Sequence, residues 1–219
     1  MNQYQAQFRP PAVKDSLFIT FEGIEGAGKS TQIKKLDHFF QDSGYRTIHL
    51  REPGGTPFGE ALRAAILQSE TPLHPMAEAH LFASSRAQLL KEVILKELEQ
   101  PKTVVICDRY IDSSLAYQGT ARGLGQETIL ELHKNTPLNT LPHKTIYIRI
   151  GLETSLERQM VRNQKKDYFE SQNRDFYQKL IEGYDEAAKR FPQRIATVDG
   201  ERDIDKIYAD IITIVKELV

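Results

Sequence analysis

A glycine-rich segment between a predicted strand and a predicted helix most constrains what this chain can fold into. Residues 17–21 are a short apolar run typical of a buried strand, and residues 23–30 follow with the pattern G-x-x-x-x-G-K-S. This is the phosphate-binding P-loop, whose glycines let backbone N–H groups converge while Lys29 and Ser30 supply a charge and a hydroxyl. A helix that starts near Gly28 would point its positive end at the same place. Because the spacing is not G-x-G-x-x-G, a dinucleotide-binding fold is disfavoured.

The composition is that of a folded protein without a strongly charged partner. The 219 residues, 40% hydrophobic and 27% charged, are enough for one substantial domain. The net charge is −1, whereas nucleic-acid-binding domains normally carry a basic excess, so we expect no nucleic-acid partner. The sequence has no apolar stretch near 18 residues and no signal-peptide pattern, and its single cysteine, Cys107, cannot form an internal disulfide. We therefore expect a cytoplasmic protein that does not associate with membranes.

Predicted strands and helices alternate along the chain. After the first strand, apolar runs predict strands at 46–50, 103–107, 144–150 and 194–198. Helical periodicity predicts helices that end near residue 42, follow Thr56, cover about 76–99, 111–118, 126–135 and 152–162, and surround 176–187 and 204–218. This alternation predicts an α/β fold with a doubly wound, five-stranded parallel sheet flanked by helices.

The domain organisation that we expect is simple. Residues 16–219 should form a single domain. Residues 1–15 contain polar residues and the Pro10-Pro11 pair, so we expect them to form a flexible tail. The alternative is a short ordered extension on the surface.

Charged residues follow several of the predicted strands. Parallel α/β sheets bind ligands at the carboxyl ends of their strands, so the P-loop, Arg51, Asp108 and Gly200 should converge on one site. P-loop proteins commonly use a carboxylate at the position of Asp108 to hold Mg²⁺ together with the P-loop hydroxyl, here Ser30. Arg109 follows, and its planar fork suits a phosphate dianion. A solvated strand-end aspartate and a structural salt bridge remain the alternatives for these two residues.

Three motifs in order carry a resemblance to a known family. They are FITFEGIEGAGKST at 18–31, REPGGT at 51–56 and DRYIDSSLAYQG at 108–119. Together they closely resemble thymidylate kinase, and the resemblance covers about residues 17–200. It implies a P-loop kinase fold of the nucleoside monophosphate kinase type and a transferase that moves the γ-phosphoryl of ATP to dTMP. The products would be dTDP, for dTTP synthesis, and ADP, with Mg²⁺ as cofactor and a homodimer as the assembly.

The resemblance also implies which residues bind each substrate. In the family, a carboxylate at the position of Glu25 faces the sugar 3′-hydroxyl, an aromatic residue at Phe82 stacks on thymine, and an arginine at Arg86 binds its O4. A proline at Pro53 often follows a cis bond there and packs near the base methyl. The ATP-binding residues would be Gly23, Ile24, Glu25, Gly26, Ala27, Gly28, Lys29, Ser30 and Thr31. The dTMP-binding residues would be Glu25, Arg51, Glu52, Pro53, Phe82, Arg86, Arg109, Ser114, Tyr117 and Gln118.

A basic segment at about 157–172 is the predicted mobile lid. Some relatives carry an arginine at the position of Gly26, and the others supply transition-state charge from the lid. Arg158 and Arg162 are four residues apart and therefore share one face of the predicted helix. Residues 167–170 depart from the lid pattern of many relatives, so Lys165 or Lys166 stays an alternative cation. The expected catalytic residues are Lys29, Arg109, Arg158 and Arg162.

Two other functions also fit a P-loop. One is another nucleotide or deoxynucleoside kinase, and the other is a switch protein that binds nucleotide and acts through partners. The sequence has no correctly spaced N-K-x-D guanine motif, and a lid rich in arginines favours phosphoryl transfer. The leading hypothesis is therefore an ATP-dependent dTMP kinase.

Overall fold

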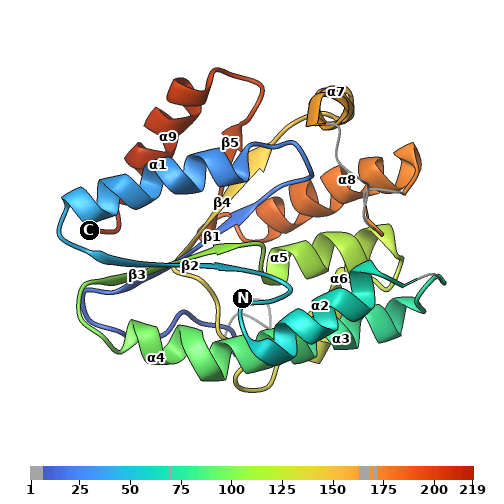
Figure 1. Cartoon of the computed structure of the whole chain (residues 1–219), viewed down its shortest axis with the longest axis horizontal. Coiled ribbons are helices and arrows are strands. Elements are labelled where there is room, and N and C mark those ends of the chain that lie inside the picture. The colour runs from blue at the N-terminus through green and yellow to red at the C-terminus, as the bar shows by residue number, and fades with distance from the viewer. Residues whose placement is uncertain (1–6, 70, 163–167, 170–171) are drawn as a thin grey trace.

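A five-stranded parallel sheet forms the centre of the molecule (Figure 1). The computed structural model describes residues 7–69, 71–162, 168–169 and 172–219, without the side chain of Arg162. The strands are β1 (Leu17–Glu22), β2 (Arg46–Arg51), β3 (Thr103–Asp108), β4 (Lys144–Arg149) and β5 (Ile195–Asp199). Their order in the sheet is β2-β3-β1-β4-β5, and every neighbouring pair is parallel. The expected five-stranded parallel sheet is confirmed, with the strand before the P-loop at its centre.

Helices cover both faces of this sheet. They are α1 (Lys29–Asp42), α2 (Pro57–Leu67), α3 (Pro75–Leu89), α4 (Leu95–Leu98), α5 (Ile111–Ser114), α6 (Gln126–His133), α7 (Leu152–Arg162), α8 (Arg174–Arg190) and α9 (Ile204–Lys216). Figure 1 shows α1 and α9 together on one face, and α3, α4, α5 and α8 on the other. In the described part of the chain, no helix is long and apolar enough to cross a bilayer.

The long helix expected at 76–99 contains a π-helical segment. Residues 90–94 have π-helical geometry and join α3 to α4, and residues 115–121 likewise extend α5. A π segment inserts an extra residue in a turn and so rotates the following side chains around the helix axis. Leu89, Leu90 and Ile94 are all fully buried. The helix thus buries these three apolar side chains where its geometry changes from α to π.

The amino-terminal residues differ from the flexible tail that we expected through residue 15. Phe8 is 7% exposed and belongs to the hydrophobic core. Arg9 forms a β-bridge with Thr140, and its carbonyl accepts a hydrogen bond from the N–H of Leu141 at 3.0 Å. An apolar side chain that finds a buried site, together with paired backbone groups, orders this segment. Residues 1–6 lie outside the described part of the chain.

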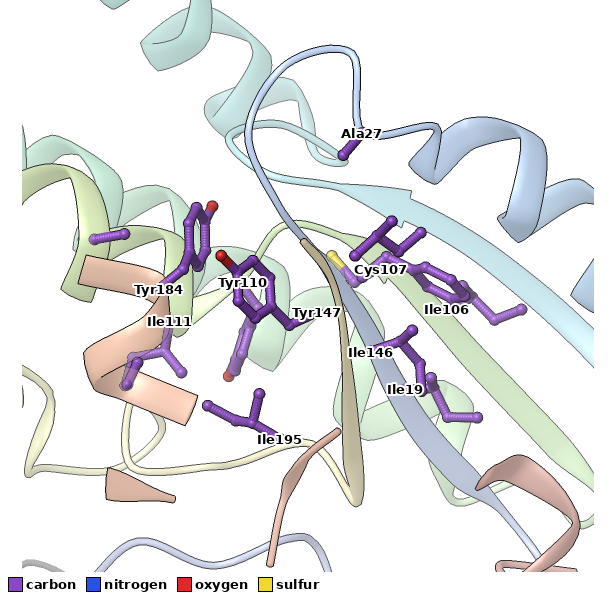
Figure 2. Packing of buried hydrophobic residues seen from close by; sticks show 14 of the residues in the cluster. Ile19, Ala27, Ile106, Cys107, Tyr110, Ile111, Ile146, Tyr147, Tyr184 and Ile195 are labelled. Carbon is purple, nitrogen blue, oxygen red and sulfur yellow. The ribbon is translucent and has the colours of Figure 1, made fainter. Parts of the chain in front are cut away.

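The central strands of the sheet are buried on both faces and form the base of the site. Ile19 on β1 lies opposite Ile106 on β3, and Ile146 on β4 lies opposite Phe21, so their side chains share one face of the sheet. Figure 2 shows the three isoleucines in this layer, and all are 0% exposed. Cys107 is also fully buried, and burial raises the pKa of its thiol. The carboxyl ends of β1 and β3 thus project from a rigid base.

Candidate active site

The P-loop forms a tight turn between β1 and α1. Gly23, Gly26 and Gly28 have φ angles of +141°, +80° and +88°, which side chains rarely adopt. A Cβ atom on Gly23 would lie 2.5 Å from the carbonyl oxygen of Ile148. Helix α1 begins at Lys29 directly after this turn. The first N–H groups of a helix have no partner within the helix, so this turn can bind an anion.

Lys29 lies folded against the loop. Its side chain is 7% exposed, and Nζ donates to the carbonyl oxygen of Gly23 at 3.0 Å. Burial lowers its pKa, as does the positive charge of Arg109, while Asp108 acts in the opposite direction. Carbonyl oxygens of the loop thus hold the ammonium group of Lys29, which can bind phosphate, at the base of the site.

A cavity of about 410 Å³ opens above the P-loop. Its lining residues are Glu25 to Thr31, Arg51, Glu52, Arg63, Asp108, Arg109 and Arg158. The P-loop, Arg51 and Asp108 therefore meet at one edge of the sheet, as the sequence predicted. Gly200 does not line this cavity, but its carbonyl oxygen accepts a hydrogen bond from Arg158. Gly23 and Ile24 of the expected ATP-binding set also do not line it, and their carbonyl oxygens accept from Lys29 instead.

Two oxygen donors in this cavity fit a magnesium ion. Oδ1 of Asp108 is buried and has no hydrogen-bond partner among the described residues. The hydroxyl-bearing Ser30 lines the same cavity. No cluster of three or more His, Cys, Asp or Glu side chains occurs in the described part of the chain. Mg²⁺ commonly uses one or two carboxylates and takes its other ligands from water and substrate phosphates, so this donor set suits it.

A second, smaller cavity of about 120 Å³ adjoins the first. Its walls include seven residues expected to bind dTMP, namely Glu25, Glu52, Pro53, Phe82, Arg109, Tyr117 and Gln118. The residues that line both cavities are Glu25, Glu52, Arg63 and Arg109. The peptide bond between Glu52 and Pro53 is cis. The first cavity, which is mostly polar, and the second, which is partly aromatic, thus share these four charged residues as a boundary.

Arg109 stands at this boundary and is held from several sides. Its φ angle is +72°, and its N–H donates to the carbonyl oxygen of Phe21 at 2.9 Å. Nη1 donates to the hydroxyl of Tyr184 at 3.0 Å, and Nη2 lies 3.9 Å from Oε2 of Glu25. The guanidinium also lies over the ring of Tyr117, 5.2 Å from its centroid. These contacts aim a cation at the junction of the two cavities.

A buried carboxylate supports Arg109 from behind. Glu22 is fully buried and accepts hydrogen bonds from the N–H of Tyr110 and from the hydroxyls of Ser113 and Tyr184, at 2.7, 2.6 and 3.1 Å. Burial, followed by the charge of Asp112, raises the pKa of Glu22 to about 7. Glu22 thus anchors the two hydroxyls that accept hydrogen bonds from Arg109.

Arg86 and Ser114 lie behind the second cavity, and neither is among its lining residues. Arg86 is 1% exposed and donates from Nε and Nη2 to Oε2 of Glu52. Its Nη1 donates to the hydroxyl of Ser114 at 3.1 Å and contacts Nε2 of His133 at 2.7 Å. Burial and the charge of Arg86 lower the pKa of His133 to about 3, so the imidazole is neutral near pH 7 and accepts through Nε2.

Two further predicted arginines lie in the first cavity. Arg51 forms a pair of hydrogen bonds to the carboxylate of Glu60, at 2.8 and 3.0 Å. Arg158 on α7 donates to the carbonyl oxygens of Gly26 and Gly200 at 3.0 and 3.1 Å. It therefore links the P-loop to the loop after β5. The side chain of Arg162 and the alternative cations Lys165 and Lys166 lie outside the described residues.

Several residues of the second cavity were missed by the sequence prediction. They are Arg63, Leu67, Ser113, Phe169 and Tyr177. Arg63 lies on α2 and donates to the carbonyl oxygen of Pro53 at 3.2 Å. The ring of Phe169 meets those of Phe82 and Tyr117 at centroid distances of 5.9 and 5.4 Å. Ser113 lies within the 108–119 motif and Phe169 within the predicted lid segment, but neither was assigned to the site. The other three belong to no short motif, because the fold brings them together from separate elements.

Comparison with known proteins connects this geometry to a family. The family model described as thymidylate kinase matches residues 21–211, which includes both cavities and every strand except the start of β1. The chain belongs to the thymidylate kinase family. This confirms the resemblance drawn from the three motifs.

Individual thymidylate kinases are similar over nearly the whole chain. The thymidylate kinase of Thermoanaerobacter sp. (strain X514) is 44% identical over 200 residues, covering 91% of this chain and 97% of the relative. That of Kosmotoga olearia is 39% identical over 196 residues, covering 90% and 93%. The crystal structure of thymidylate kinase from Ehrlichia chaffeensis superposes with a TM-score of 0.73 at 28% identity, covering 93% of this chain and 99% of that one. The P-loop kinase fold is therefore confirmed as well.

Proposed function

We propose that this protein transfers the γ-phosphoryl group of ATP to dTMP, giving dTDP and ADP. Membership of the thymidylate kinase family supports this. The observation that carries it is the pair of adjoining cavities with Arg109 in both walls. A donor phosphate over the P-loop and an acceptor phosphate in the second cavity would meet beside this cation.

The first cavity suits the phosphates of ATP. The N–H groups at the start of α1 and the ammonium of Lys29 bind the β- and γ-phosphates. Ser30 and Asp108 hold Mg²⁺, which neutralises charge on the phosphate oxygens when it is bound. Arg158 also lines this cavity and adds a second cation at the loop. The segment at about 157–172 that includes Arg158 acts as a lid on this single domain.

The second cavity suits dTMP. The base lies between Phe82, Tyr117 and Pro53, where apolar surface is available for a flat ring and its methyl group. Glu25 accepts a hydrogen bond from the sugar hydroxyl, and Arg109 binds the phosphate. Arg51 lines the first cavity, and Glu52 lines both cavities.

The chemistry is positioning and electrostatics, without a covalent intermediate. An oxygen of the dTMP phosphate attacks the γ-phosphorus while the bond to the β–γ bridging oxygen breaks, and the leaving group departs as ADP. Lys29 and Arg109 stabilise the oxygens that carry charge in the transition state, from fixed positions that need no rearrangement.

One assay separates this function from its rivals. ADP formation is measured with ATP and Mg²⁺ alone and then with dTMP, dCMP, dGMP or thymidine. We expect turnover to require dTMP. Activity with thymidine or a purine monophosphate would show a different nucleotide kinase, and ATP hydrolysis that ignores dTMP would favour a switch protein.

The variant Lys29→Ala tests the P-loop part of the proposal. It should fold normally and retain less than about a tenth of wild-type turnover, because a cation at the transferring phosphoryl is worth far more. Lys35→Ala is the matched control, since Lys35 lies on the same helix and pairs with Asp205 on the surface. Turnover above that level in Lys29→Ala would contradict the P-loop assignment.

The resemblance also implies a cytoplasmic homodimer without a nucleic-acid partner, and we propose these properties too. Sedimentation velocity at several protein concentrations tests the dimer. A single species with the mass of one chain, 25.0 kDa, would contradict it.

A further inference from the structure

A buried carboxylate behind the second cavity has no part in the proposed transfer. Glu78 lies in the first turn of α3 and is 0% exposed. Its Oε1 accepts a hydrogen bond from Nε2 of Gln118 at 2.7 Å, and its Oε2 accepts one from Nε of Arg122 at 3.3 Å. Gln118 lies in the π-helical segment after α5, forty residues along the chain. The three side chains form a short line that ends at the cavity.

The chemistry of Glu78 fixes the direction of the amide of Gln118. An ionised carboxylate can only accept hydrogen bonds, so the amide must turn its NH₂ group toward it. Oε1 of Gln118 is buried and has no hydrogen-bond partner among the described residues, while Gln118 lines the second cavity. A buried acceptor left unpaired is unfavourable, so an occupant that donates to it is favoured.

Arg122 holds the carboxylate from the other side. It donates to Glu78, and its Nη1 donates to Oε1 of Gln172 at 3.1 Å. The guanidinium also lies 4.6 Å from the ring centroid of Phe176. Because an arginine can only donate, one oxygen at position 78 must always face Arg122. The other terminal atom of the side chain at position 78 faces Gln118. Whether that atom accepts or donates a hydrogen bond determines the orientation of the Gln118 amide.

Pyrimidine rings differ in the group that would meet Gln118. Thymine and uracil carry a ring N3–H, which donates a hydrogen bond. Cytosine has an unprotonated N3 at the same place, which accepts one. An oxygen in the cavity wall therefore pairs with thymine and opposes cytosine.

We propose that Glu78, held by Arg122, is a positioning residue that sets the hydrogen-bond polarity of Gln118 and so selects a base with a ring N–H over cytosine. This rests on the proposed function and names a determinant of its substrate choice. Neither Glu78 nor Arg122 lines the cavity; both act through Gln118.

The test is the variant Glu78→Gln. Its new amide oxygen must face Arg122, so its NH₂ group faces Gln118. Gln118 then turns its oxygen toward that group and presents its own NH₂ to the cavity. The kcat/KM for dTMP should fall and that for dCMP should rise, so that their ratio drops at least about tenfold, equivalent to about 1.4 kcal/mol. The ratio of dTMP to dUMP should stay the same, because both bases carry the ring N–H.

A double variant should restore a hydrogen-bond acceptor in the cavity wall at position 118. In Glu78→Gln/Gln118→Glu, the new carboxylate at position 118 accepts from the amide at position 78 and still offers an oxygen to the cavity. The ratio of dTMP to dCMP should return to within about threefold of wild type. If the single variant does not fold, the double variant decides: a wild-type ratio supports the proposal, and a lost ratio overturns it.

Glu92→Gln is the matched control. Glu92 lies on the same helical stretch and also accepts from a glutamine, Gln88, at 2.7 Å, but this pair is exposed. Its three kcat/KM values should match wild type. An equal fall of dTMP and dCMP activity in Glu78→Gln, with an unchanged ratio, would show a purely structural role and overturn the proposal. A wild-type protein inactive toward dTMP would instead contradict the proposed function.

Discussion

Arg86 donates two hydrogen bonds to the same oxygen of Glu52, from Nε at 2.8 Å and from Nη2 at 2.5 Å. Both side chains are almost completely buried, at 1% and 2% exposure. The pair ties α3 to the loop after β2, which carries Pro53 into the wall of the second cavity. Breaking a buried ion pair leaves an uncompensated charge, so Arg86 shapes this cavity even though it does not line it.

The ion pair of Arg86 with Glu52 should contribute strongly to the stability of the fold. Arg86→Gln should lower the free energy of unfolding by about 3–5 kcal/mol, because Glu52 would keep a buried charge without its partner. Glu52→Gln/Arg86→Gln should lose clearly less, since no charge remains to be buried. Urea unfolding measures both. Arg51→Gln is the control, because the ion pair of Arg51 with Glu60 is about half exposed and should contribute no more than about 1 kcal/mol. Equal losses for Arg51→Gln and Arg86→Gln would contradict the prediction.

Arg109→Ala should weaken the use of dTMP far more than that of ATP. Arg109 lines both cavities, but its contacts to Tyr184 and Glu25 aim it at the boundary with the second. Loss of one charge-assisted phosphate contact should cost on the order of 2–3 kcal/mol in kcat/KM for dTMP. Titrating each substrate at saturating levels of the other measures this. An equal loss for both would place the guanidinium on the ATP phosphates instead.

Replacing Arg158 and Arg162 by alanine together should lower turnover more than substrate binding. Arg158 already lies at the P-loop, where it donates to Gly26, and a Cβ on Gly26 would be 3.2 Å from Cβ of Arg158. A side chain at position 26 therefore has little room, and we expect α7 to supply the cation. Single-turnover rates at saturating ATP and dTMP provide the measurement. Unchanged rates would move the catalytic cation to Lys165, Lys166 or another element.

The parts of the molecule that depend on local pattern were predictable from the sequence. The five strands, the P-loop and the strand-end position of Asp108 follow from apolar runs and glycine spacing over a few residues. The helix expected at about 76–99 is present, but its π-helical segment was not visible in the periodicity.

Contacts between distant parts of the chain were not predictable in this way. Arg86 and Glu52 are 34 residues apart in the sequence, and Gln118 and Glu78 are 40 apart. No local sequence pattern predicts either contact. Each is instead a consequence of burial, since a charged group excluded from water must find a partner. Phe8 was likewise assigned to a flexible tail because its neighbours are polar, although the fold offers it a buried site.

The raised pKa of Glu22 should make the stability of the protein depend on pH. Burial and the charge of Asp112 raise this pKa from its usual 4.5 to about 7, so between these values the folded protein binds a proton that the unfolded chain releases. The stabilisation from the protonated group is complete below pH 4.5 and is lost as pH rises through 7. A shift of this size corresponds to about 3 kcal/mol.

Glu22→Gln tests this effect, because the amide has nearly the same shape and does not titrate. Urea unfolding of both proteins between pH 5 and pH 8 gives the difference in stability, wild type minus variant. This difference should fall as pH rises and level off above pH 7. His133, whose pKa is lowered to about 3, destabilises both proteins as pH falls below about 6.5, and its effect cancels in the difference. A difference that does not change with pH would mean that Glu22 stays ionised beside the two hydroxyls that hold Arg109, and that its role there is independent of pH.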